Sequence, residues 1–332
     1  MANRTHDAAT PVVVALGGNT LLGQHGSWTA EEQRRVVERT AEQLTAAIDA
    51  GYDLVLTHGN GPQVGNLLVQ QERAAETPQL PLDVLVAETQ AQIGYLLQQA
   101  LDNERPDATD ALTLVTQVVV DPDDPAFDSP TKPVGPFYSE AEAASKPFET
   151  QRVADGERPY RRVVPSPDPV AIVEAEEIAR LVDRGNLVIC GGGGGVPVVR
   201  DGGLSGVEAV VDKDHTSQLL AAELGVETLV VLTDVEYAYV NYGDPDQRPL
   251  ERVTPAELRA HLDAGEFAAG SMRPKVEACR RFVDTDGERA VITTPDRLGD
   301  ALAGGGRDAG RPGLTLPIAF PRAGNEARPL RN

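Results

Sequence analysis

Short apolar runs and amphipathic helical segments alternate along this chain from near its start to about residue 294. Runs of β-branched and other apolar residues predict strands at 12–16, 53–57, 112–120, 187–190, 228–233 and 290–293. Apolar spacings of three and four, capping signals and glycine stops predict helices at 29–51, 61–71, 83–101, 168–185, 214–224 and 274–283, with another starting near 254. Such alternation is typical of a mainly parallel sheet with helices on both faces.

Two segments interrupt the alternation. Residues 121 to about 165 contain eight prolines and many acidic residues with little periodicity, which favours a protruding excursion such as a lid. The segment after Gly304 is rich in glycine, arginine and proline. We expect it to be poorly ordered beyond about residue 320, because nothing in it predicts docking to a core.

The net charge of −21 argues against a nucleic-acid partner, because contacts to phosphate backbones require clustered cations. The early apolar run at 12–16 is too short for a membrane span or a secretion signal, so we expect no membrane partner and a cytoplasmic protein. Cys190 and Cys279 lack paired spacing, and we interpret both as small buried residues, with a free reactive thiol as the alternative. An acidic surface poor in lysine resembles proteins of salt-loving organisms.

Three glycine-rich turns each follow an expected strand: Gly17-Gly18-Asn19, His58-Gly59-Asn60-Gly61-Pro62, and residues 191–195. In a parallel sheet such turns lie at the carboxyl edge, where ligands bind and where the next helix points its N-terminal amides. The standard P-loop, dinucleotide, hydrolase and zincin motifs do not occur in the sequence. Each turn alone is equally well explained as a tight connection, but their joint placement favours an anion-binding cradle.

Lysine is rare in this chain. Of 30 lysines and arginines, the lysines are Lys132, Lys146, Lys213 and Lys275. Lys213 and Lys275 lie at expected helix starts, where the helix dipole disfavours a cation, and a local rule broken in this way is typical of a functional site. We therefore expect Lys132, Lys213 and Lys275 to bind an anionic substrate, and we interpret Lys146 as a solvated surface cation.

Six segments resemble the signature sequences of the carbamate kinases, a branch of the amino acid kinase family. They occur in the family's order between residues 12 and 294, and together they are highly specific. The segments are ALGGN at 15–19, THGNGPQVG at 57–65, PTKPVGPF at 130–137, RRVVPSP at 161–167, GVEAVVDKD at 206–214 and GSMRPKVEA at 270–278. The sequence departs from the family's pattern in its C-terminal tail and in the variable stretch before 161.

The resemblance implies an α/β fold: a three-layer αβα sandwich around an open, mainly parallel sheet of about eight strands, with a small protruding lid subdomain, in a homodimer. It implies an N-terminal lobe for carbamate or carbamoyl phosphate at 1–120, the lid at 121–165 and a nucleotide-binding lobe at 166–320, followed by an expected disordered tail at 321–332. The implied reaction is reversible phosphoryl transfer between ATP and carbamate, giving ADP and carbamoyl phosphate. Arginine fermentation would run it towards ATP.

The resemblance also implies roles for individual residues. It places the family's catalytic lysines at Lys132, Lys213 and Lys275 and its organising aspartate at Asp214, which would ion-pair with Lys213 and Lys275. The expected substrate-binding residues are Gly17, Gly18, Asn19, Gly59, Asn60 and Gly61, with amides of Gly17, Gly18 and Gly59 around the transferred group. The expected nucleotide-binding residues are Gly192, Gly193, Asp212, Tyr237, Tyr242 and Met272, for the last three of which core packing is the alternative.

Carbamate is already an anion, so charge compensation is the main requirement of the reaction. We expect Mg²⁺ to accompany ATP or ADP, bound to phosphate oxygens and water, because the sequence shows no dedicated carboxylate cage. The alternatives are another amino acid kinase acting on a larger acid such as acetylglutamate or on UMP, and a non-catalytic ligand-sensing module on the same fold. The segments at 58–62 and 130–137 argue against the first, and retention of the lysines and Asp214 argues against the second.

Overall fold

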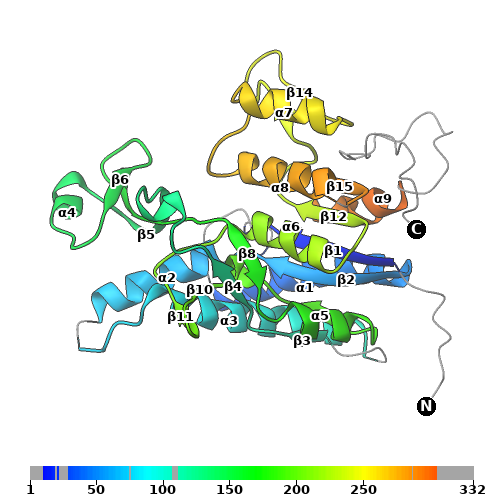
Figure 1. The fold of residues 1–332 in the computed structure, drawn as a ribbon, viewed down its shortest axis with the longest axis horizontal. Coiled ribbons are helices and arrows are strands. Elements are labelled where there is room, and N and C mark those ends of the chain that lie inside the picture. The colour runs from blue at the N-terminus through cyan, green and yellow to red at the C-terminus, as the bar shows by residue number, and fades with distance from the viewer. Residues whose placement is uncertain are drawn as a thin grey trace.

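A computed structural model describes residues 10–18, 21, 29–74, 76–106, 111–285 and 287–304. Asn19 and the tail from 305 onward lie outside the described residues, so the predictions made for them stay predictions. The fold within those ranges is a three-layer αβα arrangement (Figure 1), as the alternation of strand and helix signals predicts.

Six parallel strands form the main sheet, in the order β15-β12-β1-β2-β9-β3. Their bounds are β1 Thr10–Leu16, β2 Tyr52–His58, β3 Ala111–Thr113, β9 Leu187–Ile189, β12 Thr228–Leu232 and β15 Arg289–Thr293. The central strand β1 is buried on both faces from Val12 to Leu16, with Val14 in register with Val230 and Leu56. Continuous apolar runs are what a strand covered on both faces requires.

Two apolar clusters cover the two faces of this sheet. On one face, Val12 and Val14 pack with α1 (Ala30–Asp49), α3 (Leu82–Glu104) and α9 (Leu298–Ala303). On the other, Val13 and Ala15 pack with α5 (Ala175–Val182), α6 (Lys213–Glu223) and α8 (Met272–Thr285). The alternation of consecutive β1 side chains between clusters follows from the two-residue period of a strand. Thr29 caps α1 as predicted, accepting a hydrogen bond from the Glu32 amide.

A second sheet has the order β11-β10-β4-β8. Its strands are β4 Gln117–Val120, β8 Pro169–Ile172, β10 Val196–Arg200 and β11 Leu204–Gly206. The single strand predicted at 112–120 is therefore wrong: β3 and β4 belong to different sheets. The side chain of Gln90 binds both the amide and the carbonyl of Thr116, at 2.8 and 3.0 Å, and this holds the chain where it changes sheets.

The helix predicted at 168–185 is also wrong in its first half. Residues Pro169–Ile172 form β8, antiparallel to β4, and α5 begins only at Ala175. β8 is an edge strand, where proline's missing amide donor is tolerated, and its β-branched residues favour an extended backbone. Pro169 looked like a helix start, but the neighbouring strand β4 decided the conformation.

A small antiparallel sheet, β5-β7-β6, projects from the body together with α4 (Figure 1). Its elements are β5 Lys132–Tyr138, α4 Glu140–Ala144, β6 Thr150–Arg152 and β7 Tyr160–Val164, preceded by the 3₁₀ turn η2 Pro125–Phe127. We call residues 132–164 the protruding subdomain. The predicted excursion from the alternating pattern is confirmed here, while the exact lobe boundaries stay predictions.

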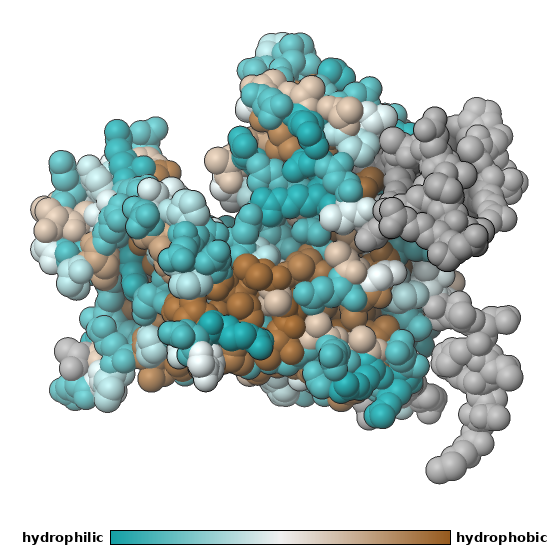
Figure 2. All heavy atoms as spheres, in the orientation of Figure 1, coloured by the Kyte–Doolittle hydropathy of each residue, from teal (hydrophilic) through white to brown (hydrophobic). Residues whose placement is uncertain are grey.

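The remaining elements connect these units or extend the upper part of Figure 1. They are α2 Gly61–Arg73, η3 Gly192–Gly194, β13 Tyr239–Val240, β14 Arg248–Pro249, α7 Pro255–Asp263 and η4 Pro295–Arg297. The capping box predicted at Thr254 is present, since Thr254 and Glu257 exchange both bonds. Figure 2 shows the surface hollowed between the protruding subdomain and the part that carries α7.

Candidate active site

The three glycine-rich turns meet at the carboxyl edge of the main sheet, after β1, β2 and β9. A Cβ atom on Gly59 would lie 3.0 Å from the Gly18 amide nitrogen and 3.6 Å from Cδ of Lys213. Such a close approach of two backbones and a lysine explains the glycine at position 59. The predicted convergence of these turns with a lysine is therefore confirmed.

The prediction for the glycine amides needs a correction. The Gly17 amide donates to the Leu232 carbonyl and the Gly59 amide donates to the Leu16 carbonyl, both at 3.0 Å. These amides continue the hydrogen bonding of adjacent strands, because the turns remain in sheet geometry for one residue past β1 and β2. Of the three amides expected around a transferred group, Gly18 is the one that we retain.

The glycine run after β9 packs against the turn at 58–60. A side chain at Gly192 would collide with His58, and one at Gly193, where φ is +65°, would collide with the Asn60 amide. Asn60 itself is buried and donates to Thr89 Oγ1 at 2.9 Å. Gly192 and Gly193 are thus buried against the turn at 58–60, and their expected role in nucleotide binding stays a prediction.

Asp214 is the centre of the lysine cluster. It lies in the first turn of α6, and its two carboxylate oxygens bind different lysines: Oδ1 pairs with Lys213, and Oδ2 lies 3.0 Å from Lys275 Nζ. The side chains are 3, 10 and 14 % exposed for Asp214, Lys213 and Lys275. The predicted ion pairing is confirmed, as is the placement of both lysines in first helical turns.

Burial and opposite charge act against each other in this cluster. Burial by itself would raise the pKa of Asp214, but the charges of Lys213 and Lys275 hold that pKa below its usual value. Burial lowers the pKa of Lys213 and outweighs Asp214, whereas for Lys275 the attraction to Asp214 outweighs burial and raises the pKa. One carboxylate thus holds two cations that have little access to water.

Lys132 is held by a different acid. Its Nζ lies 2.8 Å from Oδ2 of Asp212, while Oδ1 of Asp212 accepts the Asp214 amide at 2.9 Å and caps α6. Although burial would raise the pKa of Asp212, the Lys132 charge, followed by that of His215, holds it below its usual range. Asp212 thus links the protruding subdomain to α6, and its expected role in nucleotide binding stays a prediction.

His58 lies beside the lysine cluster and was not predicted to have a role of its own. It is fully buried, and its Nδ1 lies 3.1 Å from the Gly59 carbonyl. Burial, with a smaller contribution from the positive charge of Lys213, lowers the pKa of His58 to about 4, although the hydrogen bond with the Gly59 carbonyl acts in the opposite direction. The imidazole is therefore neutral at pH 7 and adds no charge to the cluster.

A cavity of about 480 Å³ opens beside Lys275 and contains the predicted residues Tyr242 and Met272. Tyr237, predicted to lie there, is buried in the core, and Tyr239 lines the cavity instead. The whole lining consists of Gly17, Gly18, Thr233, Asp234, Val235, Tyr239, Tyr242, Glu266, Phe267, Ala268, Gly270, Ser271, Met272 and Lys275. Sequence reasoning missed most of this wall because residues 233–242 and 266–268 carry no distinctive motif.

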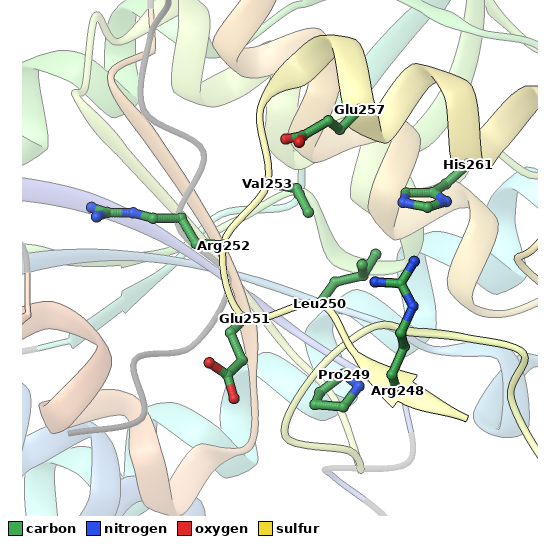
Figure 3. A pocket seen from close by; sticks show the side chains of 8 residues that line it. All are labelled: Arg248, Pro249, Leu250, Glu251, Arg252, Val253, Glu257 and His261. Carbon is green, nitrogen blue, oxygen red and sulfur yellow. The ribbon is translucent and has the colours of Figure 1, made fainter. Parts of the chain in front are cut away.

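A second hollow of about 410 Å³ lies between β14 and α7 (Figure 3). Arg248 and His261 point towards one another there, but Glu251 and Glu257 balance the charge, and Glu257 is already used in the cap of α7. None of the three clustered lysines lines it. The Asp214 cluster and its adjoining cavity therefore form the candidate active site.

The remaining predicted residues have simple surroundings. Lys146 was predicted to be a solvated surface cation. In the structure its Nζ pairs with Glu72 at 3.0 Å and lies over the Tyr138 ring, so it makes ordinary surface contacts. Cys190 and Cys279 are free and buried, as predicted, and burial raises the pKa of the Cys190 thiol to about 12.

In the ranges that the structure describes, no three His, Cys, Asp or Glu side chains group as metal ligands. No helix there is long and apolar enough to cross a membrane.

Known proteins resemble the chain over most of its length. The model of the amino acid kinase family matches residues 10–294. The carbamate kinase of Halobacterium salinarum is 52 % identical over 295 residues, which are 88 % of this chain and 95 % of that protein. The carbamate kinase of Thermococcus kodakarensis is 49 % identical over 303 residues, with 88 % and 96 % covered.

Solved structures agree with the sequence comparisons. The carbamate kinase from Giardia lamblia bound to AMP-PNP is 42 % identical with a TM-score of 0.85, and the match covers 95 % of this chain and 99 % of that one. By sequence, fold and the lysine cluster at the sheet edge, the chain belongs to the amino acid kinase family, in its carbamate kinase branch, and is a phosphotransferase.

Proposed function

We propose that the protein transfers a phosphoryl group reversibly between ATP and carbamate, giving ADP and carbamoyl phosphate. The observation that carries this proposal is the Asp214 cluster, in which one buried carboxylate holds Lys213 and Lys275 beside the 480 Å³ cavity. Relatives that are about 50 % identical to this chain are named carbamate kinase. One structural neighbour was solved with AMP-PNP, an ATP analogue.

The reaction needs charge compensation more than proton transfer. A carbamate oxygen attacks the γ-phosphorus while the bond from that phosphorus to the β,γ-bridging oxygen breaks, and charge spreads over the three equatorial oxygens. Lysine is suited to this step because its ammonium is a compact charge on a flexible stem. We assign Lys275 and Lys213 to the nucleotide phosphates and the moving phosphoryl group, with Lys132 closing from the protruding subdomain.

Asp214 keeps the two buried lysines in place between turnovers. Without a substrate, two ammonium groups at 10 and 14 % exposure would repel one another, and the shared carboxylate offsets that repulsion. When phosphates arrive, each Nζ can turn to a phosphate oxygen while keeping its bond to Asp214, because an ammonium has three donors. The Gly18 amide is assigned to the transferred phosphoryl group and the side chain of Asn60 to the acid substrate.

Mg²⁺ is expected to enter with the nucleotide. Asp212 and Asp214 are both engaged by lysines, so neither carboxylate is free to serve as a ligand, and the ion would be held mainly by the nucleotide that brings it. When bound, the ion neutralises part of the polyphosphate charge. The lysines carry the remainder of the compensation.

The cavity beside Lys275 is assigned to the nucleotide base and ribose. Tyr239, Tyr242 and Met272 offer apolar and aromatic surface to a base, and Lys275 lies at the same wall, where it can meet the phosphates. A kinase for a larger acid, such as acetylglutamate, would need additional space on the side where the acid is assigned, next to Asn60. That side is filled by the glycine run against His58 and Asn60, which favours a small acid.

We further propose a cytoplasmic homodimer that works in high salt and runs towards ATP in arginine fermentation. The face of α3 next to the edge strand β3 favours a self-association surface, because Tyr95 and Val115 are exposed there around a hollow of about 530 Å³. A Tyr95→Glu variant that keeps the dimer mass in light scattering would remove this surface from consideration.

The direct test is ATP formation from carbamoyl phosphate and MgADP, measured in high salt with a coupled assay. We expect turnover with carbamoyl phosphate and none with acetylglutamyl phosphate or UDP. Activity with either of the latter, and none with carbamoyl phosphate, would contradict the carbamate assignment while leaving the family unaffected.

A further inference from the structure

Asp168 lies at the base of the protruding subdomain. It occupies the connection between β7, the last strand of that subdomain, and β8 of the second sheet. Its backbone amide donates to Asp124 Oδ2 at 3.1 Å, and Asp124 lies in the segment that leaves β4 towards the subdomain. Asp168 therefore connects the outgoing and returning segments of the chain at the point where the subdomain joins the body.

The Asp168 carboxylate also holds both helices that carry clustered lysines. Its Oδ1 lies 3.0 Å from His215 Nδ1 on α6, and its Oδ2 lies 3.0 Å from an Arg281 guanidinium nitrogen on α8. The hydrogen bond from His215, and then the bond and charge of Arg281, hold the pKa of Asp168 below its usual range against the opposing effect of burial. The carboxylate is therefore ionised at neutral pH.

His215 has few other ways to be held. Its side chain is 12 % exposed, and among the described residues its Nε2 has no hydrogen-bond partner. Glu277 Oε2 is 3.8 Å away, beyond hydrogen-bond length, and Oε1 of the same carboxylate is taken by Arg273 at 2.8 Å. Asp168 is thus the group that fixes the imidazole next to Asp214.

This trio is separate from the substrate surfaces. Asp168, His215 and Arg281 do not line the cavity beside Lys275. Yet each belongs to a segment that carries an active-site lysine: His215 follows Lys213 by two residues, Arg281 shares α8 with Lys275, and Asp168 follows the strand paired with β5, which begins at Lys132. Because these three side chains do not line the cavity, we expect them to influence the reaction through the positions of the three lysines.

We propose that Asp168 is a positioning residue that couples the protruding subdomain, and with it Lys132, to the helices that carry Lys213 and Lys275. The inference rests on the proposed phosphoryl transfer, because its kinetic signature is read in that reaction. Asp168 fixes three backbone segments with one ionised side chain, so its removal lets Lys132 move relative to the other two lysines.

The kinetic test is Asp168→Asn, measured with carbamoyl phosphate and MgADP. We expect kcat to fall about tenfold, within the range typical of coupling between sites, while KM for ADP stays within about twofold because the cavity lining is unchanged. In a Lys132→Ala background the same substitution should change kcat by less than about twofold, because its target is already gone. Glu176→Gln, which also removes one carboxylate from an arginine pair, is the control and should leave kcat unchanged.

A second readout does not depend on activity. Hydrogen exchange of backbone amides in 132–138 and 160–164 should be faster in Asp168→Asn than in the parent chain, and Arg281→Gln should show a smaller acceleration in the same peptides. An undiminished tenfold loss in the Lys132→Ala background, or unchanged exchange in the subdomain, would overturn the coupling. A parent chain inactive with carbamoyl phosphate would refute the proposed function instead, and exchange would still decide the coupling.

Discussion

Asp212 and Asp214 are two residues apart, yet each holds lysines in a different way. Asp214 lies inside the body and binds two lysines from the first turns of α6 and α8. Asp212 caps α6 and binds Lys132, which is 31 % exposed and belongs to the protruding subdomain. The buried cluster is held by two helices of the body, α6 and α8, that pack against one another, whereas the outer pair joins the body to the protruding subdomain. From this difference we expect the lysines to divide into a fixed pair and a movable third.

The strongest test of this division is Asp214→Asn. Removing one partner of a buried ion cluster costs about 3–5 kcal/mol, and here two lysines lose their carboxylate. We expect the free energy of unfolding to fall by that amount in denaturant titrations, with a steep loss of activity. Asp212→Asn should cost clearly less, since its partner Lys132 has access to water. Equal losses in the two variants would remove the distinction between a fixed and a movable group.

Lys213→Ala tests the fixed pair in the reaction itself. Loss of one preorganised positive group at the transferred phosphoryl should lower kcat about 100- to 1,000-fold. The substitution also leaves Asp214 with one lysine instead of two, so stability should change little. Steady-state kinetics with carbamoyl phosphate and ADP, with thermal unfolding as a check on folding, measures the effect. Wild-type activity in this variant would overturn the mechanism.

As pH falls, protonation of buried His58 should destabilise the fold before the Asp212–Lys132 pair is affected. The pKa of His58 is about 4 in the folded protein, below its ordinary value of 6.5, so between these values the unfolded chain binds the extra proton. The stability due to neutral His58 is therefore complete above pH 6.5 and is lost as pH falls towards 4, amounting to about 3 kcal/mol.

The measurement is the free energy of unfolding between pH 7 and 4, with His58→Gln for comparison. The variant should show a flatter profile in this window. The Asp212–Lys132 pair should respond only below about pH 4, since the carboxylate pKa is itself held low. Identical slopes for both proteins would show that burial of His58 does not govern acid sensitivity.

The smallest expected effect belongs to Lys132→Ala. Because this lysine reaches the site from the protruding subdomain and is partly solvated, we expect kcat to fall about tenfold, near 1.4 kcal/mol in the activation barrier. Lys132→Arg should restore only part of the loss, because it returns the positive charge but not the compact ammonium. A loss as large as that of Lys213→Ala would place Lys132 among the fixed groups.

Much of the architecture could be predicted from local patterns. The buried run at 12–16, the capping residues Thr29 and Thr254 and the proline-rich excursion all determine short-range structure, and the structure confirms each. The lysines at helix starts were also visible, because a cation in that position violates a local preference. These features depend on neighbours within one or two turns of the chain.

Other features depended on partners far away in sequence. Pro169 looked like a helix start until β4 supplied a strand for residues 169–172 to pair with. The glycine amides at 17 and 59 looked available to an anion until Leu232 and Leu16 supplied carbonyls. At Pro169 a helix propensity worth a fraction of a kilocalorie was outweighed by strand pairing. At the two glycines, carbonyls from distant or neighbouring strands took the amide donors.

The sequence by itself therefore determined the layers, the edge of the sheet where the turns gather and the identity of the lysines. The resemblance already implied that Asp214 pairs with Lys213 and Lys275, whereas tertiary structure alone decided that Asp212 holds Lys132. The reason is that periodicity specifies which face of an element is buried, whereas an ion pair between two residues that lie 80 positions apart in the chain requires the tertiary arrangement of β5 and α6.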